Sequence, residues 1–139
     1  MWHSSDFFRD GSVTGALTAS EAGVTSTTAS SGKKVIDLGK GGTGPQGAYI
    51  TVNVPLATGT TPTLDCEVQF SDTVAFTVVR EKKTLPQITA KGEYSTRAQS
   101  HYQYVRVVPT VAGTTPSFGN TTIGLTTGNR EGPRNPFNN

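Results

Sequence analysis

The sequence predicts an all-β protein, a jelly-roll or other β-sandwich of about eight antiparallel strands with extended N- and C-terminal arms. First, β-branched residues dominate: Thr is the commonest residue, at 23 of 139, and Val outnumbers Leu 13 to 6. Such side chains are restricted at χ1 and suit a pleated surface better than a helix. Second, the apolar residues occur in short runs separated by Gly, Pro, Ser and Thr. These observations exclude helical bundles, coiled coils and most α/β enzymes.

The chain is expected to hold one domain between two ends of different character. Val, Ile, Leu and Phe supply 29 of the 139 residues, enough for one core. The charged fraction of only 16% argues against a self-repelling disordered chain. We assign residues 1–32 to an N-terminal arm and weakly ordered lead-in, residues 33–127 to the sandwich, and residues 128–139 to a C-terminal tail.

Four candidate strands lie in the first part of the domain. Residues 34–39 form a short apolar stretch, and residues 48–54 are the clearest strand because every even-numbered position is apolar. Residues 64–70 repeat this alternation, which indicates a second half-buried strand. Residues 74–79 are almost continuously apolar, so we expect a fully buried strand there.

Four more candidates follow a charged break at residues 80–83. They are residues 84–88, 93–97, 101–108 and 118–125. Gly92 and the pair Gln99-Ser100 separate the middle ones. Prolines at positions 55, 86 and 109 fall at strand ends or edges, because proline cannot donate to a central ladder.

The tetrapeptide Gly-Thr-Thr-Pro occurs twice, at residues 59–62 and 113–116. Each copy follows an apolar run that ends in proline, and each precedes a candidate strand. A separation of 54 residues spans several strands, so the sequence does not indicate a solenoid or a propeller. We expect two similar hairpin loops at the same end of the sandwich.

Few residues are suited to chemistry. Cys66 is the only cysteine and lies at an apolar position of the alternating run 64–70, so it is expected to be a small core residue. The histidines, His3 and His101, show no paired ligand spacing for a metal. Asp65 and Glu67 fit the exposed face of a strand better than an acid/base pair. We therefore expect no catalytic residues, no metal and no enzymatic activity.

A glycine pattern at residues 39–44 matches G-x-G-x-x-G by spacing alone. A dinucleotide site needs a helix directly after the glycines, whereas here Pro45 leads into the strand 48–54. The glycines are expected to permit positive φ in a long connection, and no cofactor is expected.

Charge and hydropathy argue against nucleic-acid and membrane partners. The net charge is +2, and the most basic region, residues 80–106, lacks interleaved stacking aromatics. No run of 18 apolar residues exists, and residues 1–11 lack the pattern of a signal peptide. We expect a soluble protein that is not exported.

The two ends carry residue types that are common at interfaces. These are Trp2, Phe7, Phe8 and Arg9 at the start, with Arg134 and Phe137 as a second, weaker candidate set. Aromatic groups exposed to water are unfavourable, so two alternatives remain open. The ends either fold back on their own domain or insert into a partner.

Over residues 14–127 the order of short motifs resembles a known family. The motifs are Ala16-Leu-Thr-Ala19, Val35-Ile-Asp-Leu-Gly39, the strand 48–54, Glu67-Val-Gln-Phe-Ser-Asp72 with Ala75-Phe76, Tyr104-Val-Arg-Val107 and Gly113-Thr-Thr-Pro-Ser117. Their succession is similar to the jelly-roll capsid cement proteins of tailed bacteriophages, the group related to the Bordetella phage cement protein. Residues 1–10 and the tail from Gly128 lie outside this pattern.

The resemblance implies a structural protein of the virion. Members of that family are not enzymes and bind the outer surface of shells built from HK97-fold major capsid proteins, as dimers or trimers that tie capsomers together. It implies the major capsid protein as partner, a homo-oligomer, and a location in host cytoplasm during assembly and on the capsid afterwards. We expect the six end residues named above to contact the capsid or a sibling copy.

A second reading is a receptor- or carbohydrate-binding β-sandwich of a phage tail fibre. Such modules usually cluster aromatic residues on loops, whereas the four tyrosines here fall in candidate strands. A small hydrolase is the third candidate function, since the sequence shows no recognisable pair of nucleophile and base.

Overall fold

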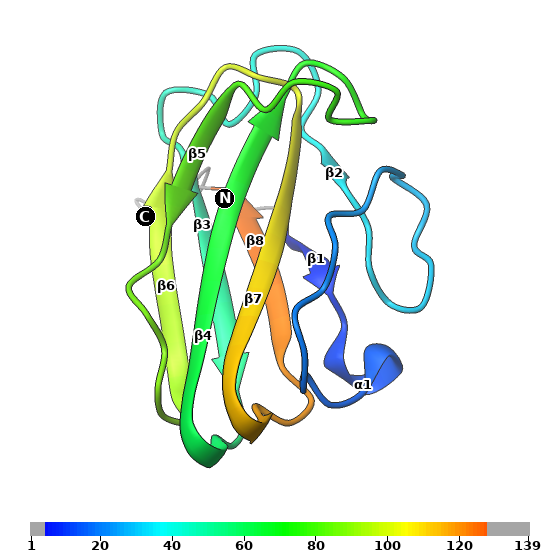
Figure 1. Ribbon diagram of the computed structural model, residues 1–139. Coiled ribbons are helices and arrows are strands. Elements are labelled where there is room, and N and C mark those ends of the chain that lie inside the picture. The colour runs from blue at the N-terminus through cyan, green and yellow to red at the C-terminus, as the bar shows by residue number, and fades with distance from the viewer. Residues whose placement is uncertain (1–4, 128–139) are drawn as a thin grey trace.

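The computed structural model describes residues 5–127, which form two packed four-stranded sheets (Figure 1). One sheet has the order β1 (Ser5–Arg9), β8 (Thr122–Thr127), β3 (Ala48–Val54), β6 (Gly92–Ala98). The other has the order β2 (Ile36–Asp37), β7 (Tyr104–Ser117), β4 (Thr58–Ser71), β5 (Glu81–Thr84). All pairings are antiparallel, and this is the strand order of a jelly roll. The predicted all-β class is confirmed.

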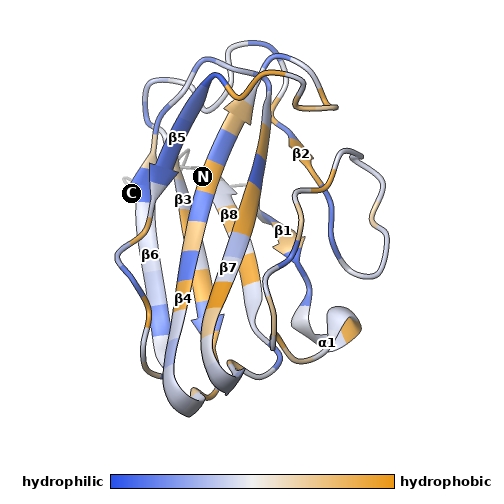
Figure 2. Ribbon diagram, in the orientation of Figure 1, coloured by the Kyte–Doolittle hydropathy of each residue, from blue (hydrophilic) through white to orange (hydrophobic). Residues whose placement is uncertain are grey.

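The core lies between the sheets and is built by alternation. In β3 the even positions Ile50 and Val52 are fully buried, and in β4 Leu64, Cys66 and Val68 are buried in the same way. Successive side chains of a strand point to opposite faces, so each sheet buries one side. Figure 2 shows the resulting bands of apolar and polar residues along β4. The predicted strands 48–54 and 64–70, and the core position of Cys66, are confirmed.

Two neighbouring predictions are wrong. Residues 74–79 do not form a strand: Phe76 is buried in a turn at φ 53°. The strand lies instead at β5, in the residues expected to be a charged break. All four residues of β5 are exposed, because an edge strand at the rim of a sandwich needs no apolar face. After it, Leu85 and Ile88 anchor the chain, and the amide of Leu85 donates to the carbonyl of Cys66 at 3.1 Å.

The two Gly-Thr-Thr-Pro copies are not separate hairpin loops. They form the ends of β4 and β7, which pair with each other, with Thr60 opposite Thr114 and Thr58 opposite Ser117. The expectation that they lie at the same end of the sandwich is correct. Both strands are therefore 14 residues long, and their register shifts around the glycines mark β-bulges.

The described part of the expected N-terminal arm packs on the sandwich. β1 pairs with β8, and a short helix, α1 (Gly11–Thr14), follows it. Leu17 is fully buried, and its backbone exchanges hydrogen bonds with Gly119 and Phe118 at 2.8 and 2.9 Å. The domain thus begins well before residue 33. In the described residues no helix is long and apolar enough to cross a membrane.

Candidate partner-contact site

An apolar surface patch lies beside β1 and α1. We call it the Phe7 patch: a hollow of about 350 Å³ lined by Phe7, Val13 and Ala29 with a polar rim that includes Asp6, Asp10 and Lys34. Phe7 is 52% exposed and Val13 is 62% exposed. Two large apolar side chains that are both more than half exposed on one hollow are typical of an interaction site.

A β-bulge decides which side chains of β1 face outward. Phe7 lies opposite Gly124 of β8, and Arg9 lies opposite Ile123, so one additional residue, Phe8, is accommodated between them. The bulge shifts the alternation, and the side chains of both Phe8 and Arg9 are buried while Phe7 points outward. Because Gly124 has no side chain, the ring of Phe7 lies over its backbone.

The rim of the Phe7 patch is held in place by local hydrogen bonds. The ammonium of Lys34 pairs with Asp6 Oδ1 at 2.9 Å. Asp10 is the N-cap of α1, and its Oδ1 accepts from the amide and the hydroxyl of Ser12 at 3.1 and 2.7 Å. The basic charge at the rim is therefore already neutralised, which leaves one carboxylate, Asp10, without an ion-pair partner among residues 5–127.

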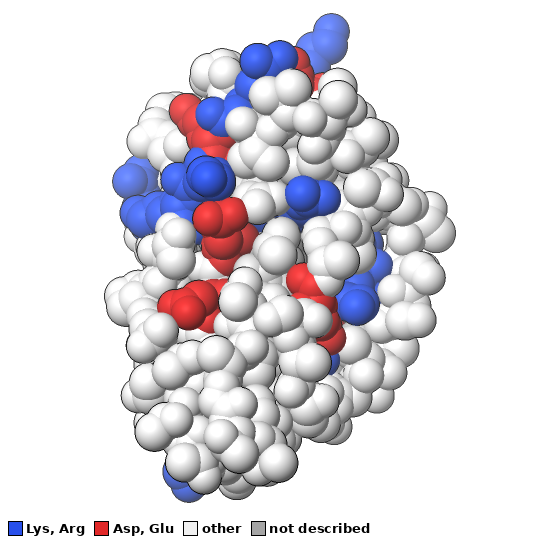
Figure 3. All heavy atoms as spheres, viewed as in Figure 1, with Lys and Arg blue, Asp and Glu red and all other residues white. Residues whose placement is uncertain are grey.

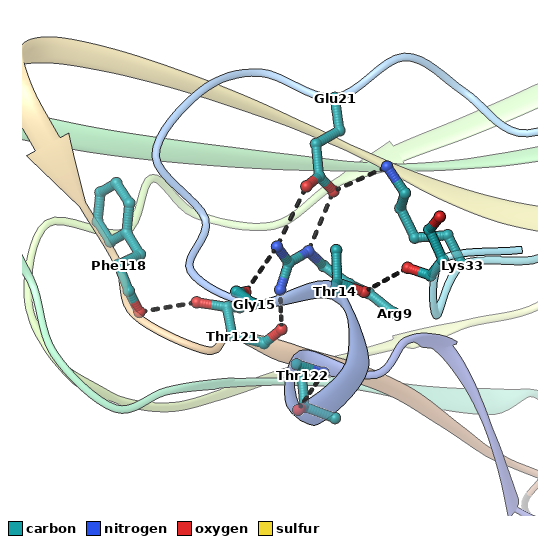
Figure 4. A network of polar contacts seen from close by, with 10 residues as sticks. Arg9, Thr14, Gly15, Glu21, Lys33, Phe118, Thr121 and Thr122 are labelled. Atoms are coloured by element: carbon teal, nitrogen blue, oxygen red, sulfur yellow. Dashed lines mark hydrogen bonds and ion pairs between the residues drawn. The ribbon is translucent and has the colours of Figure 1, made fainter.

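Behind the patch, Arg9 is the centre of a buried polar network (Figure 4). Its guanidinium donates to both carboxylate oxygens of Glu21 at 3.0 and 3.1 Å and to the carbonyls of Thr121 and Gly15. Lys33 approaches Glu21 at 3.9 Å from the outer side. The network joins β1, the lead-in and the start of β8, which fixes the N-terminal segment to the sandwich.

The six predicted contact residues therefore have three different outcomes: exposed, buried, or outside the described residues. Phe7 is on the surface. The prediction for Phe8 and Arg9 is corrected, since they are 3% and 2% exposed and their side chains cannot reach a partner in this fold. Trp2, Arg134 and Phe137 lie outside the described residues.

Sequence reasoning missed Val13. It stands alone among Gly, Ser, Thr and Ala, so no periodicity marks it. Its role depends on α1, a single turn that presents the side chain beside Phe7. The only local signal for that turn was Asp10 directly before Gly11, which fits an N-cap.

Two further titratable groups, Cys66 and Asp72, have pKa values shifted by their surroundings. Burial raises the pKa of the Cys66 thiol from its usual 9.0 to about 12, an effect that Asp65 reinforces and Arg9 opposes. A thiol with a raised pKa is a poor nucleophile. Hydrogen bonds from Arg80 lower the pKa of Asp72. Within residues 5–127, no group of His, Cys, Asp and Glu could hold a metal ion.

Charged residues lie on the outer faces of both sheets, but the row through Phe7 has none. Figure 3 shows basic and acidic atoms distributed over the face formed by β4, β5 and β7. On it, Gln87 donates to Asp65 and Gln69 donates to Glu67, so these carboxylates have partners within the sheet surface. On the other sheet the register places Phe7, Gly124 and Thr51 in one row across three strands, with no charged residue among them.

The glycine loop after β2 has the conformation expected of a connection. Gly39, Gly41, Gly42 and Gly44 all have positive φ, and the loop is tied to the β6–β7 connection by the amide of Thr43, which donates to the carbonyl of Ser100 at 2.9 Å. It leads into β3 with no helix after it, as predicted.

No protein-family model matches this chain. No curated protein sequence matches it either.

Proposed function

We propose that this protein is a structural virion protein, a capsid cement or decoration protein that binds the outer surface of an HK97-fold major capsid shell. On this proposal it is not an enzyme, and it acts by stabilising contacts between capsomers. The observation that carries the proposal is the Phe7 patch. Its residues, Phe7 and Val13 above all, present apolar area that water solvates poorly and a partner surface would cover.

The surroundings of the patch suit protein docking. A single aromatic anchor in a hollow is the usual form of an energetic hot spot. The outer row Phe7, Gly124 and Thr51 carries no charge, and at the rim Lys34 is already paired with Asp6, so Asp10 is the one rim ion without a counterion that docking would remove from water. Many copies on a symmetric shell would then reinforce one another although each contact is modest.

The patch can be tested with a single substitution. Heads from which the protein has been removed are incubated with wild type or with Phe7→Ser, and the occupancy is measured after co-sedimentation. We expect Phe7→Ser to reduce affinity by roughly tenfold or more, as at a hot spot. Val78→Ser is the matched control, because Val78 is an apolar residue of similar exposure, 49%, in another part of the domain.

Equal occupancy for wild type and Phe7→Ser would contradict the assignment of the patch. Thermal unfolding of each variant establishes that the fold is intact. Deleting the whole segment would be a poorer test, since β1 and the Arg9 network belong to the fold itself.

A further inference from the structure

We propose that the exposed edge of β6 is an interface between two copies of this chain. The two β6 strands would pair antiparallel about a two-fold axis at Ser95 and join two four-stranded sheets into one of eight strands. This inference deepens the homo-oligomer part of the proposed function. It is tested on the isolated protein, so its failure would leave capsid binding untouched.

Four strands lie at sheet edges, and three of them are protected. Residues 32–34 cover β1, with the amide of Lys34 donating to the carbonyl of Phe8 at 3.2 Å. β2 is only two residues long, and β5 is a four-residue strand that carries Lys82 and Lys83. Covering elements, short length and lysines are the usual means of preventing edge-to-edge pairing.

β6 is the least protected of the four edges, because a single side chain, Lys83, bonds one of its outward carbonyls. It is seven residues long, contains neither proline nor lysine, and is the last strand of its sheet (Figure 1). Among the described strands it pairs with β3 alone. A long edge of this kind is a template for a further strand.

One hydrogen bond identifies the backbone groups that face outward. The ammonium of Lys83, on the other sheet, donates to the carbonyl of Arg97 at 2.7 Å, so this carbonyl points away from β3. The amide and carbonyl of one residue point to the same side of a strand, and adjacent residues alternate. Glu93 and Ser95 therefore also direct their amides and carbonyls outward, and neither has a backbone partner in the described part of the chain.

The charges of β6 are self-complementary about Ser95. Glu93 and Arg97 are each two residues from it, so antiparallel self-pairing at Ser95 places Glu93 of one copy opposite Arg97 of the other, twice by symmetry. Their register against Asn53, Thr51 and Tyr49 places all three side chains on the outer face. Within residues 5–127 neither Glu93 nor Arg97 forms an ion pair. The guanidinium of Arg97 donates to the carbonyls of Gln46 and Pro45 at 3.0 and 3.4 Å, and these partners are uncharged, so its positive charge has no counterion there.

Backbone pairing adds to this charge complementarity. Because Glu93, Ser95 and Arg97 all face outward, the two strands can exchange about four hydrogen bonds. Two more form if the carbonyl of each Arg97, which already accepts from Lys83, accepts a second bond with its other lone pair. A second copy is the occupant that the charges favour, because an unrelated strand would match them only by chance. A single strand pair buries less area than the roughly 1,200 Å² of a stable complex, so we expect a reversible dimer that forms as concentration rises.

Cysteine cross-linking tests the register directly. In the proposed dimer Ser95 faces its own counterpart with Cα atoms about 5.5 Å apart, a spacing that a disulfide can bridge. We expect Ser95→Cys to form a covalent dimer under mild oxidation, read by non-reducing electrophoresis. Glu93→Cys is the matched control on the same strand and face, and it should give little dimer because it faces Arg97. Cys66 is buried and does not compete.

Charge reversal tests the pairing without a covalent bond. Sedimentation velocity over a concentration series should show Glu93→Arg and Arg97→Glu each weakening the dimer by roughly tenfold, and an equimolar mixture of the two forming a heterodimer. Lys82→Glu on β5 should have no such effect. The proposal is overturned if wild type stays monomeric at every concentration, if Ser95→Cys and Glu93→Cys cross-link equally, or if Lys82→Glu alone weakens the dimer.

Discussion

Arg9 places a permanent charge in the interior, and its four hydrogen bonds explain why the fold tolerates it. A guanidinium presents its donors in a fixed planar arrangement, so one side chain can satisfy a carboxylate and two carbonyls at once. Gly15 and Glu21 belong to the segment that follows β1, whereas Thr121 lies 112 residues away, directly before β8. Arg9 is therefore a structural residue, and the network acts as the attachment of β1 to the domain.

Removing the carboxylate from this network should be costly. Glu21→Ala leaves the charge of Arg9 buried without its counterion, and we expect a loss of about 3–5 kcal/mol in the free energy of unfolding. Chemical denaturation measures it. Lys33→Ala is the control: Lys33 is partly exposed and 3.9 Å from Glu21, so its loss should be below about 1 kcal/mol. Equal losses for both variants would contradict the role of the buried pair.

Cys66 should make the fold sensitive to alkali. The raised pKa means that, between pH 9 and about 12, the unfolded chain releases the thiol proton while the folded chain retains it. The unfolded state then binds fewer protons, so the free energy of unfolding falls with pH, by up to about 1.4 kcal/mol per unit. Denaturation curves of wild type and Cys66→Ala from pH 8 to 10.5 test this.

The two proteins are compared by how steeply their free energy of unfolding changes with pH, since Cys66→Ala also leaves a cavity that lowers this free energy at every pH. Lysine and tyrosine titration is common to both proteins and cancels in the difference. Parallel pH profiles would show that the thiol is not the cause.

At the scale of elements, the paired Gly-Thr-Thr-Pro bulges close one end of the sandwich. Gly59 and Gly113 have φ of 108° and 120°, and each lies against the backbone of the opposite copy. Thr61 and Thr115 also match each other, at φ of 47° and 46°. The two copies thus have nearly the same conformation and face each other across β4 and β7. This explains why the tetrapeptide occurs twice.

Gly113→Ala should therefore destabilise the fold by more than its positive φ alone. An added Cβ would lie 2.9 Å from the carbonyl oxygen of Thr61 and 3.0 Å from that of Thr60, so the backbone must move. We expect a loss of roughly 2–3 kcal/mol by thermal unfolding. The control Gly39→Ala has φ of 79° but meets no atom within 4 Å, so about 1 kcal/mol is expected. Equal losses of unfolding free energy for Gly113→Ala and Gly39→Ala would show that the close contact between the two Gly-Thr-Thr-Pro copies is unimportant for stability.

The elements also show what the sequence could reveal. β3 and β4 were predictable because each strand buries one face, so apolar and polar residues alternate along its sequence. β5 was not predictable, since an exposed edge strand has no apolar pattern in its sequence. The apolar run 74–79 was misleading for a different reason: it forms turns that bury Phe76 beneath Arg106, whose guanidinium lies 4.2 Å from the ring centroid. The candidate site was predictable only in Phe7, because the bulge that separates it from Phe8 arises from pairing with β8.

At the scale of the whole molecule, the sandwich is asymmetric in two ways. On the outer face of the first sheet, the row through Phe7 is uncharged and the charges of Glu93 and Arg97 lie toward β6, whereas charges are distributed over the face formed by β4, β5 and β7. One lateral side is closed by residues 32–34 and the Arg9 network, while the other exposes the long edge of β6. The proposed capsid contact and the proposed dimer contact therefore lie at opposite edges of the same sheet, so both can be occupied at once.

Binding to a capsid can be observed in an electron cryo-microscopy reconstruction of the head decorated with the protein. We expect density for the sandwich on the outer surface of the shell, with Phe7 and Val13 buried against the major capsid protein. A head to which saturating protein adds no density, or one that carries the sandwich with the Phe7 patch facing solvent, would contradict it.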